Sequence, residues 1–234
     1  MARFVAQHAP ESFQPLIDEL TQHTLATNYD RAMAGTGKSQ AFGVIRRWSY
    51  RPWLSRNTWM RPRLWQLLQE WGAAHLPAGF TYDAIQVNVD FQSKAHKDKG
   101  NLGDSYIVGF GDYTGGELNV SEAAHDIRHR GHLFNGAREW HWTSPWQGTR
   151  YSLVFFSIEW PAKFPRYSVA ARQVEDGLEI TDEYDHSITV LDQRGRLVRT
   201  VQEGQPMPWR GRVTARGQPS RMPVPAPPPS VSDA

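Results

Sequence analysis

The stretch Ile85–Asp98 reads IQVNVDFQSKAHKD and changes character in its middle. Over Ile85–Phe91, apolar side chains alternate with polar ones, which predicts a β-strand with one packed face and one polar face. After Ser93 the chain turns polar and reaches His96-Lys97-Asp98. Side chains two residues apart point to the same side of an extended segment, so His96 and Asp98 can hold one ion. We therefore expect a core strand that leads into two metal ligands.

The sequence beyond this strand predicts further short strands. After a loop over residues 99–104, Ser105–Phe110 is a buried apolar run, and Gly111–Gly116 predicts a hairpin turn with a return over Glu117–Val120. Other strands are expected around residues 131–134, 139–143 and 151–158. Many short strands with glycine-rich turns are typical of a jelly roll. We expect a mostly β fold with flanking helices, built on a double-stranded β-helix core of the jelly-roll or cupin type.

Two helices are expected before this core. Leu16, Ile17 and Leu20 have helical spacing within residues 11–29. A stronger pattern follows Pro62, at intervals of three and four residues: Leu64, Leu67, Leu68 and Trp71. We expect this second helix to back the main sheet.

Residues 32–39 fit a relaxed phosphate-loop pattern that ends in Gly37-Lys38-Ser39. A phosphate loop must leave a buried strand, whereas polar residues 27–30 come before this stretch. We interpret it as a flexible turn.

The chain is expected to have four parts. They are an N-terminal helical segment (1–40), the double-stranded β-helix domain (41–165), an appended acidic segment with a hairpin (166–203) and a proline-rich disordered tail (204–234).

The 234 residues contain no cysteine, which excludes disulfides and thiolate zinc sites. A formal net charge of +2 gives no strong overall field. Without an apolar leader or a long apolar run, we expect a soluble intracellular protein, nuclear in a eukaryote and otherwise cytoplasmic.

His141 supplies the third metal ligand that this pattern needs, from a strand expected to face His96 and Asp98. Two imidazoles and one carboxylate form the facial triad of non-haem iron(II) oxygenases, which leaves coordination positions open. Downstream, Arg150 and Ser152 share one face of the strand 151–158, where a guanidinium beside a hydroxyl suits a carboxylate. We expect Fe(II), O2 and 2-oxoglutarate to bind here.

A rival group of histidines lies at His125, His129 and His132. His125 and His129 would share the face of a helix, but the flanking Arg128 and Arg130 disfavour a cation, so we interpret this segment as a solvated loop. His132 is the second candidate for the distal iron ligand.

The segment 46–63 holds six arginines, four aromatic residues and no acid. Guanidinium groups grip phosphates and aromatic rings stack on bases, so we propose nucleic-acid contacts at Arg46, Arg47, Arg51 and Arg56. The other interpretation, that the tryptophans are core and the arginines a solvated rim, stays open.

A family resemblance covers about residues 40–160. The chain resembles the TET/JBP-type 2-oxoglutarate and iron(II) dioxygenases in the following positions: Asn88, His96-Lys97-Asp98-Lys99-Gly100-Asn101, Ser105, Gly111-Asp112, Gly115-Gly116-Glu117-Leu118, Phe134-Asn135-Gly136, His141, Pro145 and Gly148-Thr149-Arg150-Tyr151-Ser152-Leu153-Val154. It departs from the family at Asn135, where an acidic residue is commoner, and it lacks the large DNA-binding additions of animal members.

The resemblance implies a fold, a chemistry and a substrate. It places iron on His96, Asp98 and His141, and 2-oxoglutarate on Arg150 with Ser152 and Asn88. Those enzymes oxidise the methyl group of 5-methylcytosine or thymine, so DNA with methylated bases is the expected partner. Two alternatives stay open. The first is a 2-oxoglutarate-dependent hydroxylase of a protein side chain, as in prolyl hydroxylases, or of another small substrate. The second is a jelly-roll binding module without catalytic activity.

Overall fold

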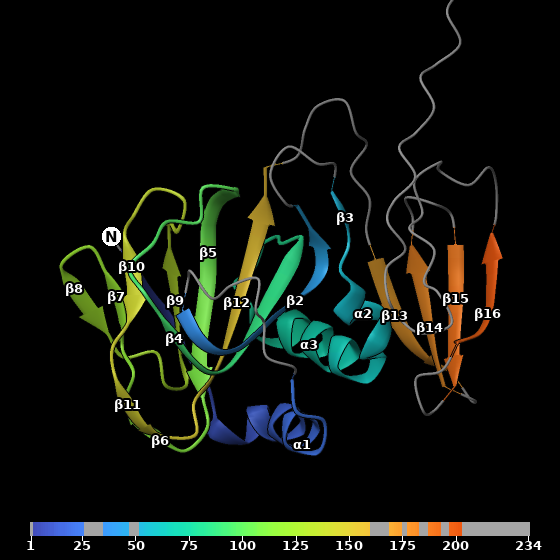
Figure 1. Cartoon of the computed structure of the whole chain (residues 1–234), viewed down its shortest axis with the longest axis horizontal. Coiled ribbons are helices and arrows are strands. Elements are labelled where there is room, and N and C mark those ends of the chain that lie inside the picture. Colours follow the sequence, from blue (N-terminus) through green and yellow to red (C-terminus); the bar gives the residue numbers. More distant parts are fainter. Residues whose placement is uncertain are drawn as a thin grey trace, which may run out of the picture.

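Antiparallel strands dominate the computed structural model, which describes residues 2–25, 35–46, 52–159, 169–174, 177–182, 187–192 and 197–202. The largest sheet has seven strands (Figure 1). In spatial order they are β1 (Arg3–Gln7), β9 (Arg130–Phe134), β5 (Asn101–Phe110), β12 (Tyr151–Ile158), β4 (Ala84–Ser93), β2 (Gly35–Ile45) and β3 (Trp53–Leu54). Smaller sheets combine β10 (His141–Thr143), β7 (Leu118–Val120) and β8 (Ala123–His125), and β11 (Trp146–Gly148) with β6 (Tyr113–Gly115).

The two faces of the large sheet carry two different cores. On one face, Leu68 and Trp71 of α3 (Pro62–His75) belong to one cluster with Val87 of β4 and with Leu153 and Phe155 of β12. The short helices η1 (Pro10–Phe13) and α1 (Gln14–Gln22) join this core, and α2 (Arg56–Met60) precedes α3. Both predicted helices are confirmed, within the described residues, and α3 backs the main sheet as expected.

The opposite face packs against the small sheet. Ile107 of β5 and Phe134 of β9 cluster with Leu118 and Val120 of β7. Two facing layers of short antiparallel strands make the predicted double-stranded β-helix, and this fold class is confirmed. A cavity lies between these layers.

The predicted hairpin between residues 105–110 and 117–120 is wrong. β5 pairs with β9 and β12, whereas β7 pairs with β8 and β10 in the other layer. The chain changes layer through β6 and the positive φ angles of Gly115 and Gly116, 79° and 69°. The expected loop 99–104 is also shorter, because β5 begins at Asn101.

The flexible turn expected at Gly35–Ser39 is wrong as well, since these residues open strand β2. Residues 32–34 lie outside the described part. Gly37 adopts φ 114°, and a Cβ there would clash with the carbonyl oxygen of Asp90. The glycine therefore allows a close approach of two strands. Because β1 and β2 both join the large sheet, that sheet also uses residues from the segment 1–40.

The C-terminal part forms a separate four-stranded antiparallel sheet (orange in Figure 1). Its strands are β13 (Val169–Val174), β14 (Gly177–Asp182), β15 (Ser187–Asp192) and β16 (Leu197–Gln202). β15 and β16 confirm the predicted hairpin, and β14 lies within the acidic stretch. The expected disordered tail lies outside the described residues. No helix in the described part could span a membrane.

Candidate metal centre

His96 and His141 are joined through their backbones. His96 follows β4 and forms an isolated antiparallel bridge with His141, the first residue of β10. Each N–H donates to the other carbonyl, with both N···O distances 3.1 Å. The two rings lie on the same side of this bridge, with centroids 4.2 Å apart. The bridge thus brings together two histidines that lie far apart in the sequence.

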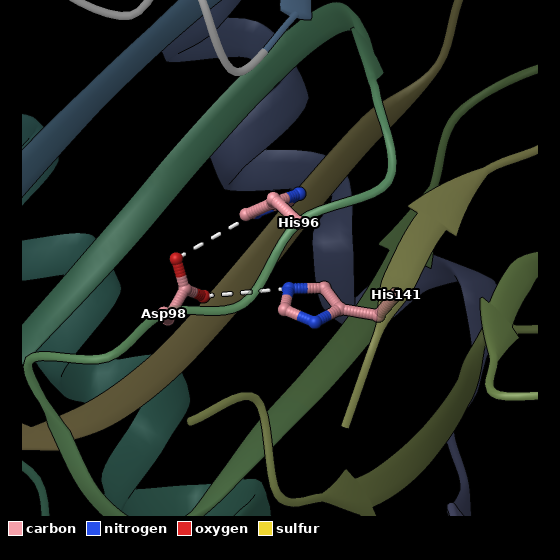
Figure 2. Close-up of side chains that lie close together, drawn as sticks. All are labelled: His96, Asp98 and His141. Carbon is pink, nitrogen blue, oxygen red and sulfur yellow. Dashed lines mark ion pairs between the residues drawn. The ribbon is translucent and has the colours of Figure 1, made fainter. Parts of the chain in front are cut away.

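Asp98 faces both imidazoles (Figure 2). Its Oδ1 is 3.6 Å from Nε2 of His96, and its Oδ2 is 3.4 Å from Nε2 of His141. Its backbone N–H donates to the carbonyl of Gly136 at 2.8 Å, which fixes the segment after His96. Two ligand atoms about 2.1 Å from one ion, at right angles, lie roughly 3 Å apart. The three side chains therefore fit one small cation.

Backbone carbonyls orient the two histidine rings. Nδ1 of His96 lies 2.7 Å from the carbonyl of Lys94, and Nδ1 of His141 lies 3.1 Å from the carbonyl of Glu139. A carbonyl oxygen can only accept, so the proton of each neutral ring is on Nδ1. The Nε2 lone pairs then face Asp98, as ligation of a metal requires. In the described part of the chain this is the one group of histidines and acids with metal-ligand spacing.

The triad lines a cavity whose other lining residues include Arg150, Ser152 and Asn88. Apolar side chains from both layers complete it: Phe91, Ile107, Leu118, Phe134, Val154 and Phe156. Arg150 and Ser152 share this face of β12, while Leu153 and Phe155 pack on the helix side, as the alternation predicts.

Arg150 is buried and fixed from several sides. Only 2% of it is exposed, and its Nε donates to the carbonyl of Gly116 at 3.1 Å. Its guanidinium lies 5.6 Å from the ring centres of Tyr113 and of Trp146. Burial raises the pKa of Tyr113 to about 12, although the neighbouring Arg150 acts in the opposite direction. The tyrosine is therefore neutral at ordinary pH, and a buried cation faces the cavity.

A bulge in β4 decides which residues line the cavity. Asp90 has φ 48°, and the register between β2 and β4 shifts between Thr36 and Lys38. The strict alternation predicted for Ile85–Phe91 would put Phe91 on the helix side, but it lines the cavity together with Ser93. That part of the prediction is wrong, because the bulge inserts one residue and reverses the two faces.

Polar residues of three strands are linked beside Arg150. Gln86 Nε2 donates to Ser39 Oγ at 2.9 Å, and Ser39 Oγ donates to Asn88 Oδ1 at 2.6 Å. Asn88 Nδ2 then donates to Ser152 Oγ at 3.1 Å. Sequence reasoning found Asn88 and Ser152 but missed Gln86, although it lies on the predicted polar face. It missed Ser39 because that segment was interpreted as a turn, and it missed Asp90 because no local signal marks a bulge.

The rival histidines lie elsewhere. His125 and His132 contact each other, with ring centroids 5.4 Å apart, and His129 stacks on Phe13 at 5.5 Å. His125 ends strand β8 and His129 lies between β8 and β9, so these two histidines do not share a helix face. His132 does not belong to the triad, which uses His141.

The arginines of segment 46–63 have varied surroundings. Arg46 is paired with Glu159, Nη1 to Oε2 3.1 Å, and also donates to its carbonyl. Arg61 donates to the carbonyls of His23 and Thr24. Arg56 is exposed at the start of α2, whereas Arg47 and Arg51 lie outside the described residues.

Comparison with protein-family models gives no match, and comparison with curated proteins gives none. Solved structures do match. NgTET1 in complex with 5mC DNA is 11% identical, with a TM-score of 0.49 over 68% of this chain and 72% of that chain. A Pseudomonas putida prolyl-4-hydroxylase is 14% identical, with a TM-score of 0.42 over 68% and 92%. An oxidoreductase of the 2OG-Fe(II) oxygenase family from Burkholderia pseudomallei is 14% identical, with a TM-score of 0.41 over 66% and 82%.

Proposed function

We propose that this chain is an Fe(II)- and 2-oxoglutarate-dependent dioxygenase. The observation that carries the proposal is one cavity lined both by the His96, Asp98 and His141 triad and by the buried Arg150. A triad on one side of a cation leaves positions open for a bidentate 2-oxo acid and O2. The charges of Asp90 and Glu117 act on the buried Arg150 guanidinium, but no described carboxylate forms an ion pair with it. Such a guanidinium fits the distal carboxylate of that acid.

Each group has a separate task in this scheme. His96, Asp98 and His141 would hold the iron, which when bound supplies the oxidising chemistry by using O2 to decarboxylate 2-oxoglutarate and hydroxylate a C–H bond. Arg150, with Ser152, anchors the distal carboxylate and so points the keto acid end toward the triad. The apolar side chains of the cavity, such as Phe91 and Phe134, exclude water from the reacting atoms.

For the substrate, we propose the methyl group of 5-methylcytosine or thymine in DNA. Support comes from Lys97 and Trp140, which adjoin the bridged residues His96 and His141 in the chain. Trp140 is 55% exposed, and Lys97 Nζ lies 5.5 Å from its ring centre. Exposed Lys94, Lys99 and Arg138 are close along the chain. Cations beside an exposed aromatic ring suit a nucleic-acid strand.

The reacting base would have to leave the helix stack to reach the cavity. Successive residues of an extended segment point to opposite sides, so Lys97 and Trp140 face away from the triad. They would therefore contact the strand next to the reacting nucleotide rather than the reacting base itself. An exposed tryptophan also suits the ring of proline, which makes a hydroxylase of a protein side chain the second candidate.

The experiment is a turnover assay with matched histidine variants. The protein is incubated with Fe(II), 2-oxoglutarate and air, with either 5-methylcytosine DNA or a proline-rich peptide, and succinate and oxidised products are measured by mass spectrometry. Oxidised nucleosides that disappear in His141→Ala but persist in His125→Ala support the DNA proposal. Hydroxylated peptide alone favours the second candidate. Absence of succinate with both substrates overturns the oxygenase proposal.

A further inference from the structure

The hydrogen-bonded chain from Gln86 to Ser152 has a direction. It starts at the amide nitrogen of Gln86, which donates to Ser39 Oγ. Ser39 Oγ accepts from Gln86, and its single hydroxyl proton is donated to Asn88 Oδ1. The amide oxygen of Asn88 is thus used as an acceptor, and its nitrogen donates to Ser152 Oγ. This hydrogen-bonded relay thus runs from Gln86 of β4 to Ser39 of β2, back to Asn88 of β4, and on to Ser152 of β12.

The relay determines the hydrogen-bonding role of the Ser152 hydroxyl. Its oxygen already accepts from Asn88, and no acceptor for its hydroxyl proton is found among the described side chains. Ser152 is 2% exposed and lines the cavity on the same face of β12 as Arg150. Its proton is therefore available to a group in the cavity that lies beside the guanidinium.

We propose that Ser39, Gln86 and Asn88 are positioning residues that make Ser152 a hydrogen-bond donor toward the distal carboxylate of the co-substrate. The inference rests on the proposed function and adds a selectivity to it. A carboxylate accepts from Arg150 through one oxygen and from Ser152 through the other. A 2-oxo acid of the same length that ends in a methyl group gains nothing from an oriented hydroxyl. The relay therefore selects co-substrates that end in an anion.

Calorimetry on the full chain tests the inference without turnover. Mn(II) loads the triad, and the dissociation constants of 2-oxoglutarate and of 2-oxopentanoate, its methyl-ended counterpart, are measured. Ser39→Ala breaks two links of the relay. We expect it to weaken 2-oxoglutarate about tenfold and to leave 2-oxopentanoate within about twofold. Ser157→Ala is the matched control, because the Ser157 hydroxyl donates to Thr81 on another side of β12.

A double-mutant cycle shows whether Ser39 acts through Ser152. In a Ser152→Ala background, Ser39→Ala should have no further effect on 2-oxoglutarate. Equal weakening of both acids, or undiminished loss in that background, overturns the inference because it indicates a general structural role. Unchanged affinity in Ser39→Ala also overturns it.

Further measurements distinguish a folding defect, and a failure of the proposed function, from a failure of the inference itself. Thermal unfolding is recorded for each variant, and Asn88→Leu replaces Ser39→Ala in the cycle if the latter does not fold. A wild-type protein that binds Mn(II) but not 2-oxoglutarate overturns the proposed function, and the inference with it. A wild type that binds 2-oxoglutarate but shows no selectivity against 2-oxopentanoate overturns the inference alone.

Discussion

Asp90 and Arg150 hold each other through two hydrogen bonds. The backbone N–H of Asp90 donates to the carbonyl of Arg150 at 2.8 Å, and the backbone N–H of Arg150 donates to Oδ1 of Asp90 at 2.8 Å. Asp90 is the left-handed residue of the β4 bulge, and Gly37 allows the close approach of β2 at that point. The bulge therefore has two effects. It places the Phe91 side chain in the cavity wall, and it fixes the backbone of Arg150.

Asp90 substitutions should separate the two roles of this residue. Asp90→Asn keeps an acceptor and tolerates the left-handed conformation, so we expect stability close to that of the wild type. Asp90→Gly removes the acceptor and tolerates the left-handed conformation, but it makes the unfolded chain more flexible. Asp90→Ala also adds backbone strain, and we expect it to lose about 2 kcal/mol of unfolding free energy. Urea unfolding measures the unfolding free energies of the variants. An alanine variant as stable as the asparagine variant would contradict the prediction.

Metal binding should stabilise the folded chain. A ligand that binds only the native state at 100 times its dissociation constant adds about 2.7 kcal/mol to the unfolding free energy. We expect Mn(II) to raise the melting temperature, and a chelator to reverse the rise. Asp98→Ala should abolish the rise, while His125→Ala should keep it. A rise that survives in Asp98→Ala would place the metal elsewhere.

His8 should make stability depend on pH. His8 Nε2 lies 2.6 Å from the Tyr106 hydroxyl, and the ring packs against Trp71 and His75. Burial, followed by the charges of His75 and His129, lowers the pKa of His8 to about 4. Between pH 6.5 and 4 the unfolded chain binds the extra proton, so stability is complete above pH 6.5 and falls toward pH 4.

The loss from His8 is at most about 3 kcal/mol. Unfolding free energies of wild type and His8→Phe, measured from pH 7 to pH 4, give the difference in slope. Exposed His23 provides the control, since His23→Gln should leave the slope unchanged. Burial also lowers the pKa of His75 and His129, so part of the slope should remain in His8→Phe. Identical slopes in the wild type and His8→Phe would refute the role of His8.

Trp140 and Lys97 should contribute differently to nucleic-acid binding. Loss of a stacked base in Trp140→Ala should cost about 1 to 3 kcal/mol of binding free energy. Loss of one phosphate contact in Lys97→Met should lower the slope of log affinity against log salt by about 1. Fluorescence anisotropy of a labelled single-stranded oligonucleotide measures both. Arg199→Gln, at an exposed position of β16, is the control. Wild-type binding in both variants would remove this surface from the proposal.

The arginine-rich segment is tested in the same assay. Arg56 is exposed, whereas Arg46 is paired with Glu159, so we expect Arg56→Gln to lower the salt slope more than Arg46→Gln. Arg47→Gln and Arg51→Gln complete the set. If affinity and salt slope stay at wild-type values in all four variants, the segment has no part in binding, and the interpretation of a solvated rim is correct.

The sequence by itself determined the elements whose signal is local. The alternation of Ile85, Gln86 and Val87 reveals which residues face the helices, and the spacing of Leu64, Leu68 and Trp71 reveals a helix. His96 and Asp98 could be paired because two positions in an extended segment share a side. The choice of His141 over His132 rested on the residues around it, and the structure brings His141 to the triad.

Only the tertiary structure decided the features that depend on contacts between distant segments. The partner of β5, the strand at Gly35–Ser39 and the bulge at Asp90 all follow from which backbones lie side by side. Local periodicity carries no information on such pairing, because the same alternation fits any neighbouring strand. One inserted residue reverses the two faces of a strand, and no local sequence pattern reveals it. The relay from Gln86 through Ser39 to Ser152 likewise forms only when three strands pair.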